Sequence, residues 1–257
     1  MFDLELRDKV AMITGGSDGL GRATAERLAE AGCKVAICAR RQAHLESVAQ
    51  TISSATGSEV LPCPADVARA EDIDRFVSRT VEHFGGVDIV INNAGTSAAH
   101  GFESVDDAAW QTDIDLKLMA AVRLCRATVA LMRQCGGGSI VNATIVGGKA
   151  PAARALPTTV TRAAGLNLTK SLAQEFAADR IRVNAICIGL IKSAQWERRA
   201  GDGTVDDLYA DMANRIPLGR VGEAREYADL AAFLVSARAA YITGVAVNLD
   251  GGLCAVV

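Results

Sequence analysis

The chain has 257 residues, half of them apolar, and a net charge of −3. That length and apolar content suit one α/β domain with a large buried core. The weakly acidic balance gives no electrostatic basis for binding nucleic acid or an anionic membrane surface, and no apolar run approaches the roughly 18 residues of a membrane span. Residues 1–5 also lack the regions of a secretory signal, so a cytoplasmic location is expected.

Short apolar, β-branched runs alternate with longer helical periods along the chain. The strands are predicted at 9–14, 34–39, 59–63, 88–92, 138–143, 182–186 and 245–249. The helices are predicted at 21–31, 42–56, 70–84, 107–135, 158–178 and 223–236. Right-handed helical crossovers between parallel strands place helices on both faces of a sheet. We therefore predict an α/β fold, with residues 1–257 forming a single doubly wound domain around a seven-stranded parallel sheet. Residues 192–216 are predicted to form a lid over the carboxyl ends of the strands.

A glycine-rich loop lies between the first predicted strand and the first helix. Gly15, Gly19 and Gly21 have the spacing T-G-x-x-x-G-x-G. Glycine permits the tight turn there and lets backbone N–H groups reach a pyrophosphate at the helix N-terminus. We therefore expect a dinucleotide to bind along this loop, which also contains Ser17, Asp18 and Leu20. A glycine turn with only a structural role is the alternative.

The residues after the second predicted strand indicate which dinucleotide binds. NAD-selective sites usually have an acidic residue there, which accepts hydrogen bonds from the ribose. This chain has Ala39, Arg40 and Arg41 instead. A small residue followed by guanidinium groups leaves room for a 2′-phosphate and offers it paired donors. NADP(H) is favoured over NAD(H), although the two arginines could instead begin a solvated helix.

Together with further motifs, the glycine loop resembles the short-chain dehydrogenase/reductase family, which has a Rossmann-type fold. These motifs are Asn92–Gly95, Asn184–Ser193, Tyr241–Gly244 and Asp250–Gly252. The resemblance implies that the adenine contacts Asp66 and Val67. It implies that the adenosine ribose contacts Asn93, Ala94 and Gly95, and that the nicotinamide contacts Gly189, Ile191 and Ser193. It also implies a homo-oligomer, a tetramer or a dimer, formed through the helices at 107–135 and 158–178.

The four catalytic positions of that family are all substituted in this chain. Ile145 replaces the serine, Thr158 the tyrosine, Arg162 the lysine and Asp115 the asparagine. The thirteen-residue spacing between the first two positions is kept, so no insertion hides a match. Arg162 can still hydrogen-bond the nicotinamide ribose, as the family's lysine does. Asp115, Thr158 and Arg162 remain the candidate catalytic residues.

The substitutions remove the family's usual proton donor. A phenol near an ammonium group has a pKa close enough to working pH to exchange a proton, whereas a threonine hydroxyl is a far weaker acid. General acid–base catalysis contributes roughly 10²- to 10⁴-fold in rate. Candidate replacement acids are Tyr209 in the predicted lid and Asp115. A core-packing or exposed tyrosine and a solvated carboxylate are the alternatives.

Four cations fall in segments expected to border the pocket: Lys149, Arg154, Arg162 and Lys192. They could bind an anionic small-molecule substrate, or they could be ordinary solvated charges. The three histidines are scattered, and no metal site is predicted.

Three functions are compatible with these residues. The first is an NADP(H)-dependent oxidoreductase on a carbonyl or alcohol, with a non-standard proton donor. The second is a non-redox enzyme, a lyase, isomerase or hydratase, on the same scaffold. The third is a catalytically silent NADP(H)-binding sensor or scaffold protein.

Overall fold

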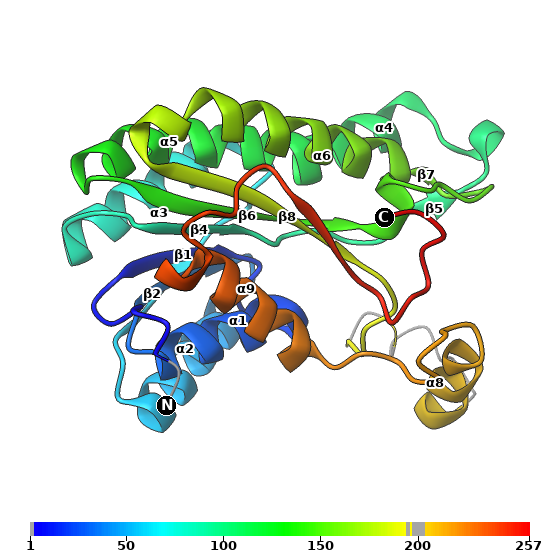
Figure 1. The fold of residues 1–257 in the computed structure, drawn as a ribbon, viewed down its shortest axis with the longest axis horizontal. Coiled ribbons are helices and arrows are strands. Elements are labelled where there is room, and N and C mark those ends of the chain that lie inside the picture. The colour runs from blue at the N-terminus through cyan, green and yellow to red at the C-terminus, as the bar shows by residue number, and fades with distance from the viewer. Residues whose placement is uncertain (1–2, 194–195, 197–203) are drawn as a thin grey trace.

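A computed structural model describes residues 3–193, 196 and 204–257 (Figure 1). Its main sheet has seven parallel strands in the order β3-β2-β1-β4-β6-β8-β9. Their bounds are β1 Val10–Thr14, β2 Lys34–Ala39, β3 Val60–Pro64, β4 Ile89–Asn92, β6 Gly138–Ile145, β8 Ile181–Ile188 and β9 Ala246–Leu249. The predicted seven-stranded doubly wound sheet is therefore confirmed.

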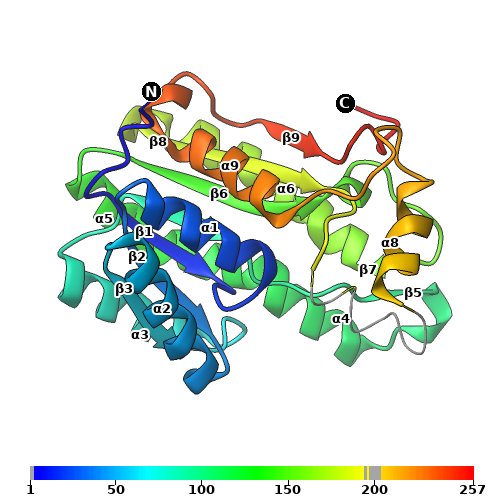
Figure 2. The ribbon, with the colours of Figure 1, turned by 90° about the horizontal axis from the view of Figure 1, so that it is seen from below.

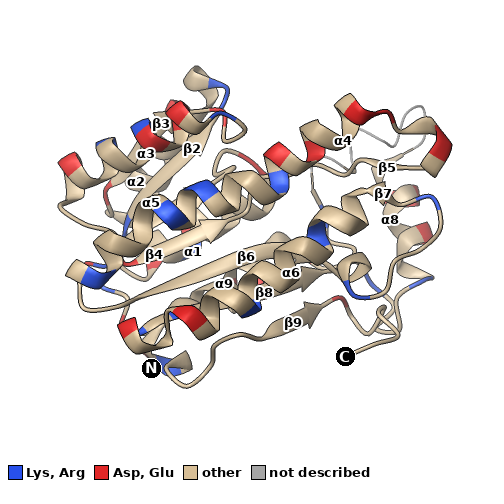
Figure 3. Cartoon of the chain, turned by 90° about the horizontal axis from the view of Figure 1, so that it is seen from above, with Lys and Arg blue, Asp and Glu red and all other residues tan. Residues whose placement is uncertain are grey.

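Helices cover both faces of this sheet (Figures 1 and 2). One face packs against α1 Gly19–Glu30, α2 Gln42–Thr56 and α9 Ala224–Val235. The other packs against α3 Ala70–Phe84, α5 Ala120–Gln134 and α6 Thr158–Glu175. Each layer buries its own apolar cluster, as expected for parallel strands covered on both sides. In Figure 3, the charged positions of α5 are all Lys or Arg and those of α4 are all Asp or Glu.

The strand order reverses between β1 and β4, which are direct neighbours in the sheet. At such a switch point the connections after the two strands leave in opposite directions, and the space between them accepts a ligand. Here those connections are the glycine loop after Thr14 and the Asn93–Gly95 segment. Below them, Asn92 donates to Asn142 Oδ1 (2.8 Å) and Asn142 donates to Thr169 Oγ1 (2.9 Å). This buried chain of amides ties the central strands to α6.

The helix predicted at 107–135 is interrupted. It consists of α4 Asp107–Ile114, a π-helical segment Asp115–Met119 and α5. A π segment adds a residue to one turn and shifts the face presented by everything after it. The helical period read from the sequence assumed one continuous helix, so it missed this shift. On α4 and the π segment, the residues classed as buried are Asp113 and Lys117.

Smaller elements lie near the carboxyl ends of the strands. β5 Ala99–His100 pairs with β7 Leu156–Pro157, and α8 Val205–Ala213 lies between β8 and α9 in the chain. In the predicted lid at 192–216, residues 194–195 and 197–203 lie outside the described residues, so the lid stays a prediction. Among the described helices, none has the length and apolar character needed to cross a bilayer.

Candidate active site

The glycine loop has the geometry of a phosphate cradle. Gly15 and Gly19 have φ values of +68° and +51°, which favour glycine. A Cβ on Gly21 would overlap the Gly15 carbonyl oxygen, so the start of α1 packs directly on the turn. Above Gly19, a Cβ would meet only Ser193 Cβ, at 3.8 Å. The loop is therefore closed underneath and open at the N-terminus of α1, where a phosphate is favoured.

Asp18, directly before α1, is an acidic residue beside this anion site. Its carboxylate accepts hydrogen bonds from Ser17 Oγ (2.7 Å) and Arg41 Nη2 (2.8 Å), and it contacts His44 Nε2 (3.1 Å). Burial alone would raise the pKa of Asp18, but the hydrogen bonds from Ser17, His44 and Arg41 outweigh it and lower that pKa. Arg41 thus offsets the charge of Asp18.

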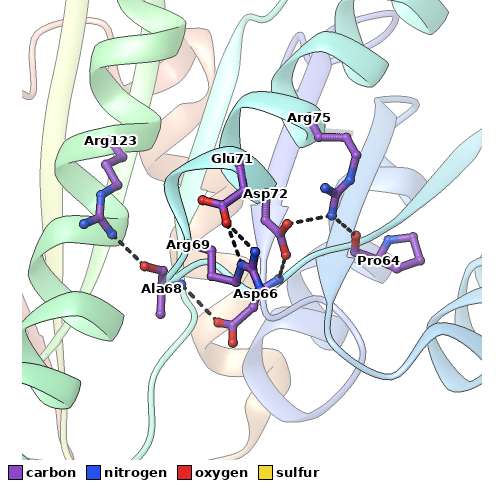
Figure 4. Close-up of polar contacts among 8 residues, drawn as sticks. All are labelled: Pro64, Asp66, Ala68, Arg69, Glu71, Asp72, Arg75 and Arg123. Carbon is purple, nitrogen blue, oxygen red and sulfur yellow. Dashed lines mark hydrogen bonds and ion pairs between the residues drawn. The ribbon is translucent and has the colours of Figure 1, made fainter.

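A cavity of about 370 Å³ lies at the end of β2 and β3. Its walls include Arg40, Asp66 and Arg69. The turn that holds Asp66 is fixed by hydrogen bonds, from Ala68 N–H to Asp66 Oδ1 (3.1 Å) and from Asp66 N–H to Asp72 Oδ2 (2.7 Å) (Figure 4). Arg40, expected from the sequence to bind a 2′-phosphate, lies in this wall. Val67, also assigned to the adenine, is buried beside this turn.

The segment after β4 supports the glycine loop from the other side. Thr14 Oγ1 accepts hydrogen bonds from the N–H groups of Asn93 and Ala94, both at 3.0 Å. The Asn93 side chain donates to Thr14 O at 3.0 Å. Gly95 lies against Arg162, since a Cβ on it would overlap Arg162 Nη2. The predicted Asn93–Gly95 segment and the glycine loop therefore form one structure.

Arg162 lies against the Asn93–Gly95 segment. Its Nη1 donates to Ala143 O at 2.5 Å, while its Nε is buried with no partner among the described residues. Burial lowers the pKa of Arg162, and the charge of Asp113 opposes that shift. An unpaired buried donor carries a free-energy cost, so this nitrogen fits a bound group with hydroxyl or phosphate acceptors.

The segment after β8 reaches the glycine loop. Gly189 packs on Asp250, whose Cβ lies 2.6 Å from where a Cβ on the glycine would be. Ile191 pairs with Gly222 in an isolated parallel bridge. Ser193 lies over Gly19 and donates its backbone N–H to the Tyr209 hydroxyl at 3.1 Å. Tyr209 is thus bonded to the backbone of this segment.

Thr158, in the family's tyrosine position, belongs to a buried polar network. Its Oγ1 accepts hydrogen bonds from Ala98 N–H (3.0 Å) and from Lys117 Nζ (2.6 Å). Lys117 also forms an ion pair with Asp113, whose other carboxylate oxygen accepts from Thr161 Oγ1 at 2.7 Å. The side chain of Lys117 has 0% exposure and that of Asp113 3%. An ammonium group therefore lies against the hydroxyl that replaces the phenol.

Asp115 is not part of this network. Its carboxylate accepts from Gln111 Nε2 (2.9 Å) and Arg123 Nη2 (3.1 Å), and it is partly exposed. The structure therefore brings Thr158 close to Asp113 and Lys117 and pairs Asp115 elsewhere. Ile145, in the serine position, ends β6 and offers no hydroxyl.

Three of the four predicted pocket cations, Arg162, Lys149 and Lys192, are bonded to protein groups. Lys149 donates to Ala246 O (2.8 Å) and Asn248 Oδ1 (2.7 Å), which ties the end of β6 to β9. Lys192 pairs with Glu223 at 2.5 Å and lies 5.8 Å from the centre of the Tyr209 ring. Arg154 is exposed. The anionic substrate stays a prediction.

Sequence reasoning missed Asp113 and Lys117. They are four residues apart in the sequence, which puts both on one face of a helix, and the apolar residues Ile114, Leu116 and Leu118 are close to them in the sequence. That signal was present, but an (i, i+4) ion pair usually lies on a solvated surface. The buried position follows from packing against α6.

Comparison with known proteins agrees with this geometry. A family model described as "Enoyl-(Acyl carrier protein) reductase" matches residues 15–254. Dehydrogenase/reductase SDR family member 4 of Bos taurus is 34% identical over 252 residues, covering 96% of this chain and 88% of the relative. The structure of L-sorbose reductase from Gluconobacter frateurii, complexed with NADPH and L-sorbose, has a TM-score of 0.97 and 35% identity, with 100% of both chains covered.

A third similar protein is a short-chain oxidoreductase from Pseudomonas aeruginosa PAO1, solved with NADPH bound and described as containing an atypical catalytic centre. It has a TM-score of 0.92 and 34% identity, covering 98% of this chain and 100% of that one. The chain therefore belongs to the short-chain dehydrogenase/reductase family, as its motifs predicted.

Proposed function

We propose that this protein is an NADP(H)-dependent oxidoreductase that interconverts a carbonyl compound and its alcohol with a proton donor other than tyrosine. The observation that carries the proposal is the arrangement of Arg162. Among the described residues its buried Nε has no partner, and its guanidinium packs on Gly95, in the segment that supports the glycine loop. A dinucleotide bound along the glycine loop and this segment would supply an acceptor for this donor. The NADPH complexes of the sorbose reductase and the Pseudomonas oxidoreductase support the same cofactor.

Distinct residues would hold each part of the cofactor. Arg40, Asp66 and Val67 would hold the adenosine with its 2′-phosphate. The N-terminus of α1, from Gly15 through Ser17, Asp18, Gly19 and Leu20 to Gly21, would bind the pyrophosphate. Asn93, Ala94 and Gly95 would support the adenosine ribose, and Gly189, Ile191 and Ser193 the nicotinamide. Arg41 would act indirectly, because it neutralises Asp18 beside the phosphates.

Bound NADPH would supply the hydride that reduces the carbonyl carbon. The protein must then orient the substrate and provide a proton to its oxygen. Arg162 would hold the nicotinamide ribose but is a poor acid, since a guanidinium keeps its proton even where burial lowers its pKa. Ile145 cannot hydrogen-bond a carbonyl. Substrate orientation therefore depends on other polar groups at the start of α6, where Thr158 lies.

A cytoplasmic location, a homo-oligomer and a lid at residues 192–216 are further parts of this proposal. A silent NADP(H)-binding protein is the second candidate, because the family's serine and tyrosine hydroxyls are both missing.

A substrate panel separates these functions. The purified protein should be incubated with NADPH and ketones, ketoses including L-sorbose, and β-ketoacyl thioesters, and with NADP⁺ and the corresponding alcohols. Cofactor absorbance and product analysis are read together. Oxidation of NADPH matched by alcohol product supports the oxidoreductase. Substrate conversion without a change in the cofactor indicates a non-redox enzyme, and tight NADPH binding without conversion indicates the silent protein.

A further inference from the structure

The buried network around Thr158 lies at the position where the family places its proton donor. Thr158 is the first residue of α6, and Ala98, which donates a hydrogen bond to it, follows the Asn93–Gly95 segment. Lys117 reaches the same hydroxyl from the π segment. The widened helical turn and α6 thus bring a cation and a hydroxyl together near that segment.

The hydrogen bonds at Thr158 orient its hydroxyl. Oγ1 accepts from Ala98 N–H and from Lys117 Nζ, so both of its lone pairs are occupied. The hydroxyl proton is then directed away from these two donors. Thr158 is only 4% exposed, so the acceptor of that proton must be a group seated against the first turn of α6. A substrate oxygen there would receive this hydrogen bond.

Lys117 is suited to replace a proton that Thr158 gives away. The pKa of Lys117 is lowered to about 8, chiefly by burial; the charge of Arg162 acts in the same direction, and the hydrogen bond and charge of Asp113 oppose both effects. Asp113 on α4 and Arg162 on α6 are the charged groups that act on this lysine. From α5, Arg123 pairs with Asp115 instead. An ammonium group with such a pKa can give up a proton near neutral pH, which an ordinary surface lysine does not readily do.

We propose that Lys117 supplies the proton for carbonyl reduction through the Thr158 hydroxyl, in place of the family's tyrosine. This inference rests on the proposed function. With a hydride that bound NADPH would supply to the carbonyl carbon, the C=O π electrons would move to oxygen. That oxygen takes the Thr158 proton while Thr158 Oγ1 takes one from Lys117 Nζ. Lys117 is left as a neutral amine beside Asp113 and regains a proton from water before the next turnover.

This assignment predicts a pH dependence with a definite sign. Reduction requires the ammonium form of Lys117, so its rate should be level below pH 8 and fall about tenfold per pH unit above the pKa of the lysine. Alcohol oxidation requires the amine form, so its rate should rise over the same range. A lysine that serves only to hold α4 to α6 would give neither dependence.

The test compares four variants with the wild-type protein, using the substrate found in the panel. Lys117→Met removes the acid, and Lys117→Arg keeps the charge but cannot deprotonate. Thr158→Val removes the relay hydroxyl while leaving the Lys117–Asp113 pair, and Thr158→Ser restores the hydroxyl. Lys170→Met, which removes an exposed lysine of α6, is the matched control. NADPH affinity and thermal unfolding are measured for each, and Lys117→Arg and Thr158→Val keep the test valid if Lys117→Met fails to fold.

A second readout needs neither cofactor nor turnover. In protein labelled with [¹³Cε]lysine, the Lys117 signal is assigned by its loss in Lys117→Arg. It should titrate near pH 8, while ordinary lysines titrate at about 10.4.

The expected result is a loss of at least about 100-fold in kcat for Lys117→Met, Lys117→Arg and Thr158→Val. KM and NADPH affinity should change little, and Thr158→Ser should recover most of the activity. In one contrary result the wild-type protein reduces a carbonyl while these variants keep its kcat and pH dependence; in another, Lys117 titrates above pH 10. Either result overturns the role of Lys117 and leaves the proposed function standing. If the wild-type protein binds NADPH and reduces no carbonyl, the proposed function fails and the inference fails with it.

Discussion

Replacing Arg40 should separate NADPH from NADH binding. Arg40 forms part of the wall of the cavity of about 370 Å³ at the end of β2, and Arg41 is already paired with Asp18. A hydrogen bond to a charged group contributes about 1.5–3 kcal/mol. Since each 1.4 kcal/mol is a factor of ten, Arg40→Ala should weaken NADPH binding by about 10- to 150-fold. NADH has no 2′-phosphate, so its affinity should hardly change.

The assay is a fluorescence titration of each dinucleotide at fixed ionic strength. Arg75→Ala is the matched control, because it removes the same charge from a side chain that bonds Asp72 and Pro64 O near the cavity (Figure 4). Its effect on NADPH should be small. Equal losses of NADPH affinity for the two variants would show that Arg40 acts through the overall electrostatic field of the protein and not through contact with the 2′-phosphate. Wild-type affinity for NADPH equal to that for NADH would refute the cofactor preference.

Three further variants test the packing around the site. Gly21→Ala should abolish NADPH binding or lower stability by about 1–3 kcal/mol, because its Cβ would overlap a carbonyl of the loop; an unperturbed titration and melting curve would contradict the cradle. Tyr227→Phe should raise the free energy of unfolding by about 1 kcal/mol in urea, since the buried Tyr227 hydroxyl lacks a partner among the described residues; a clear loss of stability would indicate an unseen partner. Lys149→Met should cost about 2 kcal/mol through its lost bonds to β9, with KM unchanged; a raised KM instead would return Lys149 to substrate binding.

Most of the fold was readable from the sequence. Parallel strands buried on both faces are short apolar runs, and their alternation with amphipathic helices leaves few topologies. The start of α6 at Thr158 and both ends of α3 were predicted to the residue. The break between α4 and α5 was not, because a π segment preserves apolar composition and changes only which residues face inward.

The candidate site was also predicted only in part from the sequence. Phosphate binding uses backbone and glycine at fixed spacing, so the loop at Gly15–Gly21 was visible as a pattern. The partners of polar side chains were not, because they come from segments far apart in sequence. Lys117 donates a hydrogen bond to Thr158, 41 residues away in the sequence, and Arg41 donates one to Asp18, 23 residues away. Only the packed structure shows that Asp115 pairs with Arg123 and that its neighbour Asp113 faces α6.

This chain is proposed to transfer hydride from NADPH to a carbonyl without the family's tyrosine. Incubation with NADPH carrying deuterium at C4 of the nicotinamide, one stereoisomer at a time, tests it directly. Mass spectrometry should find one deuterium on the former carbonyl carbon of the alcohol product with one stereoisomer and none with the other. NADPH binding with no deuterated product from any carbonyl in the panel would contradict the account.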